Sequence, residues 1–130
     1  MKFLQIKITS DKGRGVFADK HFSVGETIEV CPVLLLSPKE AKLCAQTMLD
    51  NYLFEWENEK DAAIVLGYGS IYNHSYHPNA EYLRDFANKT MIIKALTDIS
   101  PNAEIFVNYN GEPNNYDQVN IEGVPPHSDH

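Results

Sequence analysis

Hydrophobic and polar residues alternate along several short stretches of the chain, as they do in half-buried β-strands. In the first stretch, Leu4, Ile6 and Ile8 alternate with polar residues. Later stretches carry the β-branched and aromatic residues typical of strands, at residues 26–36, 52–56, 62–66, 80–86, 90–96 and 104–109. We expect the strands at 80–86 and 90–96 to pair as a hairpin, because only residues 87–89 separate them.

One stretch carries the signals of a helix instead. Ser37 is a predicted N-cap, Pro38 takes the first helical position, and Glu40 completes a capping box. The apolar residues that follow fall on one helical stripe, at Ala41, Cys44, Ala45, Met48 and Leu49. We therefore expect an amphipathic helix that lies on the core and ends near Asp50. Together with the strands, this predicts a mainly β domain of small sheets with one or two short helices.

The length and charge of the chain limit the classes of function. A chain of 130 residues, 43% of them hydrophobic, is long enough for one domain with its own core. The formal net charge is −7, and the excess lies near the end, because six acidic residues and no basic residue follow Lys94. Such a surface repels nucleic acid and anionic membranes and attracts cationic partners. We therefore predict no direct contact with nucleic acid or with a membrane.

The cysteines and the N-terminal residues bear on the compartment. Cys31 and Cys44 form no C-x-x-C pair, and two cysteines at this chain length indicate reduced thiols in the core rather than a disulfide framework. The N-terminal residues alternate and carry charges, unlike a signal peptide, and no apolar stretch reaches the length of a membrane span. We expect a cytoplasmic protein, with export by a system that needs no N-terminal signal as the alternative.

The stretch SDKGRGVFAD at residues 10–19 contains Gly13, Gly15 and Ala18 in the G-x-G-x-x-A spacing of dinucleotide-binding turns. That fingerprint requires a helix to open at the turn. Here the chain continues with Gly25 and the β-branched stretch TIEV, which predict a turn and a second strand. The glycines are therefore interpreted as residues of a β-turn, where the absence of Cβ allows a positive φ.

A second unusual stretch, LGYGSIYNHSYHPNAEY at residues 66–82, is rich in side chains that hydrogen-bond nearby backbone. Asn73, Ser75 and Asn79 can hold such a loop in one irregular shape. His74 and His77 raise the alternative of a metal site, and hence of a metal-dependent hydrolase. We predict no metal there, because neither cysteine is near and acidic neighbours are few.

Three motifs, taken in order, resemble the SET-domain family of protein lysine methyltransferases. They are KGRGVFA at residues 12–18, NHSYHPN at 73–79 and ISPNAEIFVNYNG at 99–111, and the resemblance spans residues 7–111. The phrases YLFEW, LGYGSIYNHS and NYNG are also similar to those of compact SET proteins found in bacteria. The resemblance implies the SET (β-clip) fold of small sheets. In that fold, the segment carrying Tyr109 passes beneath the loop of Asn73 and His74 as a C-terminal pseudoknot.

The resemblance also implies where the site lies. The cofactor would be S-adenosyl-L-methionine, bound by Lys12, Gly13, Arg14, Gly15, Asn73, His74 and Tyr109. Tyr109 would also be the catalytic residue. The channel for the substrate lysine would be lined by Tyr82, Tyr68, Tyr52 and Val107. The SET domain would cover residues 1–112 and leave an acidic, flexible tail, rich in Asn, Pro and Gly, at 113–130.

The function implied is methyl transfer to a lysine of a basic protein, such as a histone-like protein, a histone or a ribosomal protein. Many relatives carry a zinc-binding, cysteine-rich segment after the catalytic tyrosine, but no cysteine follows Cys44 here. The tail, or a second subunit of a homodimer joined through CPVLLL at residues 31–36, would have to complete the channel. This departure leaves one alternative, a catalytically weak SET-derived module that binds a basic protein partner.

Overall fold

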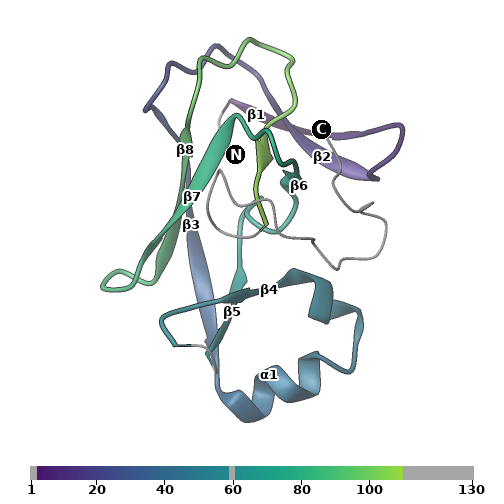
Figure 1. Ribbon diagram of the computed structural model, residues 1–130, viewed down its shortest axis with the longest axis vertical. Coiled ribbons are helices and arrows are strands. Elements are labelled where there is room, and N and C mark those ends of the chain that lie inside the picture. Colours follow the sequence, from purple (N-terminus) through teal and green to yellow (C-terminus); the bar gives the residue numbers. More distant parts are fainter. Residues whose placement is uncertain (1–2, 59–60, 110–130) are drawn as a thin grey trace.

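The computed structural model describes residues 3–58 and 61–109. Within them lie the strands β1 (Leu4–Ile8), β2 (Arg14–Ala18), β3 (Thr27–Leu36), β4 (Leu53–Glu55), β5 (Ala62–Val65), β6 (Asn73–His74), β7 (Ala80–Asp85), β8 (Thr90–Ala95) and β9 (Phe106–Val107). An antiparallel sheet pairs β1 with β2, a five-stranded sheet has the order β4-β5-β3-β8-β7, and a parallel sheet pairs β6 with β9 (Figure 1). The predicted mainly β architecture of small sheets is confirmed.

The ten-residue strand β3 links the two halves of the molecule, as Figure 1 shows. Its first half pairs with β8, where Val30 lies opposite Ile92, and its second half pairs with β5, where Leu34 lies opposite Ile64. β8 in turn pairs with β7, which confirms the predicted hairpin. At the end of β3, Leu34 and Leu35 are 52% and 43% exposed. The homodimer contact predicted at this stretch stays a prediction.

The glycine-rich motif forms the end of a turn and the start of a strand. In the turn, the Thr9 main-chain N–H donates to the Gly13 carbonyl at 2.6 Å, and Gly13 has a φ of +69°. Because a positive φ favours glycine, the turn interpretation is confirmed for Gly13. It is wrong for Gly15, which is buried inside β2 opposite Lys7.

The helix α1 (Pro38–Cys44) begins as predicted but ends early. The Ser37 hydroxyl accepts from the Glu40 N–H at 3.2 Å, and the Glu40 carboxylate accepts from the Ser37 N–H at 2.9 Å, which confirms the capping box. The predicted end near Asp50 is wrong. The Thr47 hydroxyl donates to the Cys44 carbonyl at 2.7 Å, which competes with continued helix, and a separate 3₁₀ helix, η1 (Met48–Tyr52), follows.

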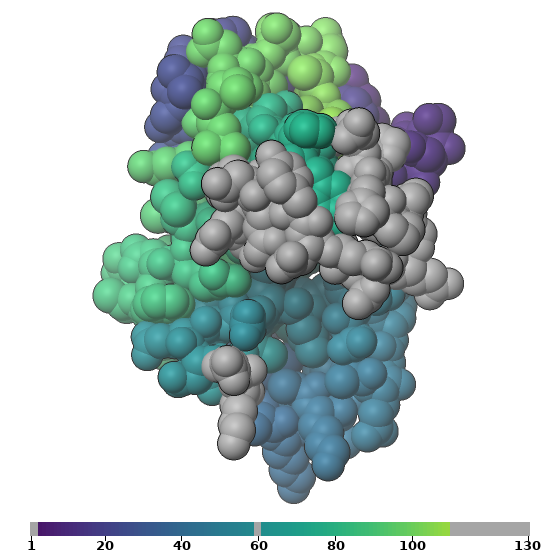
Figure 2. All heavy atoms as spheres, in the orientation of Figure 1, coloured from purple at the N-terminus to yellow at the C-terminus, as the bar shows by residue number. Residues whose placement is uncertain are grey.

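The prediction that this helix lies on the core is also wrong. None of the described residues of α1 or of η1 is buried, and Met48 and Leu49 of the apolar stripe are 70% and 40% exposed. The two helices contact each other, and α1 contacts β3. They lie at the end of the molecule far from β1 and β2 (Figure 2).

The polar loop, residues 66–79, contains β6, which pairs in the interior with the last described strand, β9. β6 and β9 run parallel, with His74 opposite Val107. Asn79 holds the pair from the side, because its amide nitrogen donates to the Glu104 carbonyl at 2.9 Å and its oxygen accepts from the Phe106 N–H at 2.8 Å. Side chains of the loop thus satisfy buried backbone groups, as the sequence predicts.

The core gathers side chains from all three sheets. Val16, Cys31, Met91 and Ile105 are fully buried there. The tail predicted at residues 113–130 lies outside the described residues. No helix within 3–58 and 61–109 is long and apolar enough to cross a membrane.

We predict that Asn79→Ala destabilises the pairing of β6 with β9. The substitution removes both hydrogen bonds of the Asn79 side chain to the C-terminal segment, so the free energy of unfolding should fall by about 2 kcal/mol or more. Urea denaturation measures this change. Asn88→Ala, in the exposed turn between β7 and β8, is the matched control and should change the same quantity by less than about 0.5 kcal/mol. Equal stability of the two variants would contradict the prediction.

Candidate functional site

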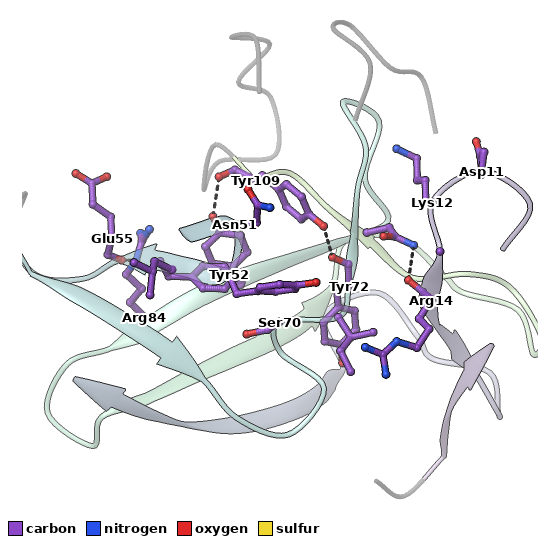
Figure 3. Close-up of a pocket in the computed structure, with 16 residues that line it drawn as sticks. Asp11, Lys12, Arg14, Asn51, Tyr52, Glu55, Ser70, Tyr72, Arg84 and Tyr109 are labelled. Atoms are coloured by element: carbon purple, nitrogen blue, oxygen red, sulfur yellow. Dashed lines mark hydrogen bonds between the residues drawn. The ribbon is translucent and has the colours of Figure 1, made fainter. Parts of the chain in front are cut away.

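A cavity of about 640 Å³ lies where the β1–β2 turn, η1, β4, the polar loop and β7 meet (Figure 3). Its walls combine aromatic and aliphatic side chains with charged, amide and hydroxyl groups. The lining residues are Asp11, Lys12, Gly13, Arg14, Asn51, Tyr52, Leu53, Phe54, Glu55, Ser70, Ile71, Tyr72, Asn73, Tyr82, Arg84 and Tyr109. Lys12 and Arg14 lie at one end, Glu55 and Arg84 lie at the other, and Tyr109 lies between them (Figure 3). The cavity therefore has a turn end, at Lys12 and Arg14, and a strand end, at Glu55 and Arg84.

Hydrogen bonds hold Tyr109 at the centre of the cavity. Its hydroxyl donates to the Tyr72 carbonyl at 2.7 Å, its main-chain N–H donates to His74 Nδ1 at 3.1 Å, and its carbonyl accepts from the Tyr82 hydroxyl at 3.2 Å. Burial raises the pKa of Tyr109, and it raises the pKa of Tyr82 to about 12. Both hydroxyls therefore keep their protons near neutral pH and act as hydrogen-bond donors.

Asn73 connects the glycine-rich motif to the C-terminal segment. Its amide nitrogen donates to the Arg14 carbonyl at 3.1 Å and to the Glu104 carboxylate at 2.7 Å. Gly15 lies directly against this pair. A Cβ at Gly15 would fall 2.8 Å from the Asn73 amide nitrogen and still closer to the Glu104 carboxylate. Glycine is thus required here by the close approach of three segments.

Charged groups of both signs border the cavity. Burial lowers the pKa of Lys12, while the charges of Asp11 and Glu104 act in the opposite direction. At the strand end, the Arg84 guanidinium lies 5.5 Å from the centre of the Tyr82 ring. Within the described ranges, no group of three or more His, Cys, Asp or Glu side chains is placed to hold a metal ion. The cavity offers partners for a ligand that carries both a carboxylate and a cationic group.

The structure brings together most of the residues predicted for the site. Of the predicted cofactor residues, those that line the cavity are Lys12, Gly13, Arg14, Asn73 and Tyr109. Of the predicted lysine-channel residues, Tyr52 and Tyr82 line the same cavity. Their division between cofactor and substrate stays a prediction.

The other predicted residues lie behind these walls. Gly15 packs against Asn73, and His74 is fully buried beneath the main chain of Tyr109. Val107 is 2% exposed, and its carbonyl accepts from the Ser75 N–H at 3.0 Å. Tyr68 is partly buried, and its N–H donates to the Glu29 carboxylate at 3.0 Å. None of these four is among the described residues that line the cavity.

Sequence reasoning missed two carboxylates behind the cavity. Glu104 accepts from Asn73, and Glu29 accepts from the Tyr72 hydroxyl at 2.7 Å. Glu29 had a usable signal, because it lies two residues before the buried Cys31 and therefore on the same face of β3. The lining residues that the sequence did not single out are Asp11, Asn51, Leu53, Phe54, Glu55, Ser70, Ile71, Tyr72 and Arg84.

Comparisons with known sequences match this chain to one family. The family model of the SET domain matches residues 13–110. A Schizosaccharomyces pombe protein named histone-lysine N-methyltransferase, H3 lysine-37 specific, is 36% identical over 107 residues. The matched part covers 82% of this chain and 72% of that protein.

Comparisons with solved structures agree with the sequence match. A Plasmodium falciparum protein assigned as a histone methyltransferase has a TM-score of 0.64 and 31% identity, and the match covers 84% of this chain and 94% of that chain. The Neurospora SET-domain protein DIM-5, a histone lysine methyltransferase, also has a TM-score of 0.64, at 23% identity, with 82% of this chain and 51% of that chain covered. The likeness to DIM-5 shows the fold alone.

We predict that Gly15→Ala destabilises the protein, because the added Cβ would press on the Glu104 carboxylate and the Asn73 amide. Overpacking of this kind costs about 1–3 kcal/mol, which urea unfolding curves resolve. Glu104→Ala should be destabilising by itself. Combined with Gly15→Ala, it should recover part of the loss, because it removes the clashing carboxylate. Strictly additive effects would show that close packing at Gly15 is not the cause.

Proposed function

The chain belongs to the SET-domain family, and on that premise we propose that its cavity binds S-adenosylmethionine at the turn end and a substrate lysine at the strand end. The chain is a protein lysine methyltransferase, and enzymes of this kind in the SET family use S-adenosylmethionine as the methyl donor. The observation that carries the proposal is the position of the Tyr109 hydroxyl between the two ends of one cavity.

The turn end fits the methionine part of the cofactor. Asn73 holds the main chain of Arg14 beside the polar loop, and Gly13 lines the cavity without a side chain. The ammonium of Lys12 and the guanidinium of Arg14 are partners for a carboxylate, and main-chain carbonyls are partners for an amino group. When bound, the cofactor supplies a methyl group made electrophilic by its sulfonium.

The strand end fits an aliphatic chain that ends in an amine. Phe54 and Tyr82 meet edge to face with their ring centres 5.5 Å apart, and Tyr52 lines the cavity from the end of η1. Removal of the lysine amine from water lowers its pKa, because desolvation disfavours the charged form. The amine therefore releases its proton to water more readily, and its lone pair becomes available for methylation.

Tyr109 acts through its position in this proposal. Its raised pKa keeps the hydroxyl protonated, so Tyr109 donates to the Tyr72 carbonyl and can accept a hydrogen bond from the substrate amine. Methyl transfer is an in-line displacement, so alignment of the reacting atoms matters more than a strong base. The contacts of Tyr109 with His74 and Tyr82 fix its main chain from two sides.

We propose a histone or another basic protein as the substrate. The net charge of −7 favours partners rich in Lys and Arg, and the Schizosaccharomyces pombe relative is named as a histone H3 methyltransferase. Asp11 and Glu55 add carboxylates at opposite ends of the cavity. Attraction of this kind is screened by salt, so methylation of histones should weaken as ionic strength rises.

We predict that the protein transfers labelled methyl groups from S-adenosylmethionine to core histones and that Tyr109→Phe lowers kcat roughly 100-fold or more. The substitution keeps the ring but removes the hydroxyl that orients the amine. Cofactor affinity, measured by calorimetry, should change little. Tyr76→Phe is the control, because Tyr76 is buried but is not among the described residues that line the cavity. Unchanged turnover in Tyr109→Phe, or no transfer by the wild type, would overturn the proposal.

We predict that Asn73→Ala weakens cofactor binding at least about tenfold, which corresponds to about 1.4 kcal/mol. The reason is that the main chain of Arg14 and the carboxylate of Glu104 both lose the amide that joins them. Isothermal titration with S-adenosylmethionine measures the affinity, and unfolding curves show whether the variant is folded at the titration temperature. Asn88→Ala should bind like the wild type. Wild-type affinity in folded Asn73→Ala would place the cofactor elsewhere.

A further inference from the structure

We propose that Glu29 is a positioning residue for methyl transfer, which fixes the loop whose carbonyl receives the Tyr109 hydroxyl. The inference rests on the proposed function and deepens it. Glu29 belongs to β3 and stands behind the cavity, so it acts through Tyr72 rather than on the substrate.

The Glu29 carboxylate is a buried fixed point between β3 and the polar loop. Glu29 is only 7% exposed. One oxygen accepts from the Tyr72 hydroxyl at 2.7 Å, and the other accepts from the Tyr68 N–H at 3.0 Å. The pKa of the nearby Cys31 thiol is raised by burial and by the Glu29 charge. A buried carboxylate needs such donors, because burial without them is costly.

These bonds fix both ends of residues 68–72, which form a turn rather than a strand. Within the turn, the Ile71 N–H donates to the Tyr68 carbonyl at 2.8 Å. Ser70, Ile71 and Tyr72 from this turn line the cavity. Because both Glu29 oxygens bind this segment, one side chain anchors both of its ends.

Tyr72 links Glu29 to Tyr109 through two hydrogen bonds. The Tyr72 side chain is 1% exposed, its hydroxyl is held by Glu29, and its carbonyl accepts from the Tyr109 hydroxyl at 2.7 Å (Figure 3). A shift of the Tyr72 main chain would therefore redirect the Tyr109 hydroxyl. In reactions that depend on alignment, a displacement of about 1 Å can cost about 100-fold in rate.

Glu29→Gln tests this chain of contacts without a large change in volume. The amide places an NH2 donor where one carboxylate oxygen was, so Tyr72 and Tyr68 can no longer both donate to this side chain in the same geometry. We expect kcat to fall about tenfold, less than for loss of the hydroxyl itself, while KM for histones and cofactor affinity stay unchanged. Tyr72→Phe should reproduce the loss, because it removes the other partner of the same hydrogen bond.

A double substitution with Tyr109→Phe separates positioning from general damage to the fold. Glu29 acts through the Tyr109 hydroxyl, so Glu29→Gln should lower kcat little further once that hydroxyl is gone. Glu26→Gln is the matched control. Glu26 precedes β3 and pairs with Lys20 near the surface, so its substitution should leave kcat unchanged.

Hydrogen exchange of the protein alone gives a readout that does not need activity. The Tyr68 amide donates to Glu29, so it should exchange faster in Glu29→Ala, which removes both acceptor oxygens, than in the wild type. Wild-type kcat in Glu29→Gln, unchanged exchange at Tyr68 in Glu29→Ala, or equal fold losses with and without Tyr109→Phe would each overturn the inference. Absence of methyl transfer by the wild type would instead overturn the proposed function.

Discussion

The parallel pairing of β6 with β9 is the constraint on which the rest of the structure depends. It places an irregular, polar segment in the interior, where every main-chain N–H and C=O needs a partner. Asn79 supplies both a donor and an acceptor to the C-terminal segment, and His74 receives the N–H of Tyr109. The density of Asn, Ser and His in residues 73–79 is therefore a structural requirement of this pairing.

Two carboxylates that do not line the cavity help to fix its shape. Glu104 accepts a hydrogen bond from Asn73, which also contacts the glycine-rich motif. Glu29, on β3, accepts a hydrogen bond from Tyr72 of the polar loop. Each carboxylate accepts from a side-chain donor in the loop and so fixes one side of the same cavity. An active site that works by alignment needs rigid surroundings more than it needs a group of unusual basicity. In this structure, hydrogen bonds to acidic residues behind the cavity hold its walls in place.

The features predicted well are those whose signals lie within a few residues of one another. The strands, the β7–β8 hairpin and the Ser37 cap all depend on such local patterns. The helix end was wrong because the apolar stripe was assumed to meet a core, whereas the Thr47 hydroxyl competes for the Cys44 carbonyl. Of the site, the family motifs led to Tyr109 and Asn73. The partners of the two missed carboxylates lie 31 and 43 residues away, and no local pattern predicts contacts of that range.

The segment that contains α1 and η1 differs from the rest of the molecule because none of its described side chains is buried. None of the described residues from 37 to 52 is buried, so this segment can open with much less free energy than the whole domain requires. Asn51 and Tyr52 nevertheless belong to the cavity wall. A molecule that contacts them stabilises the segment by mass action, and the stabilising free energy rises with the logarithm of its concentration above Kd. Occupancy of the cavity and order at this end of the protein are therefore thermodynamically linked, and each reports on the other.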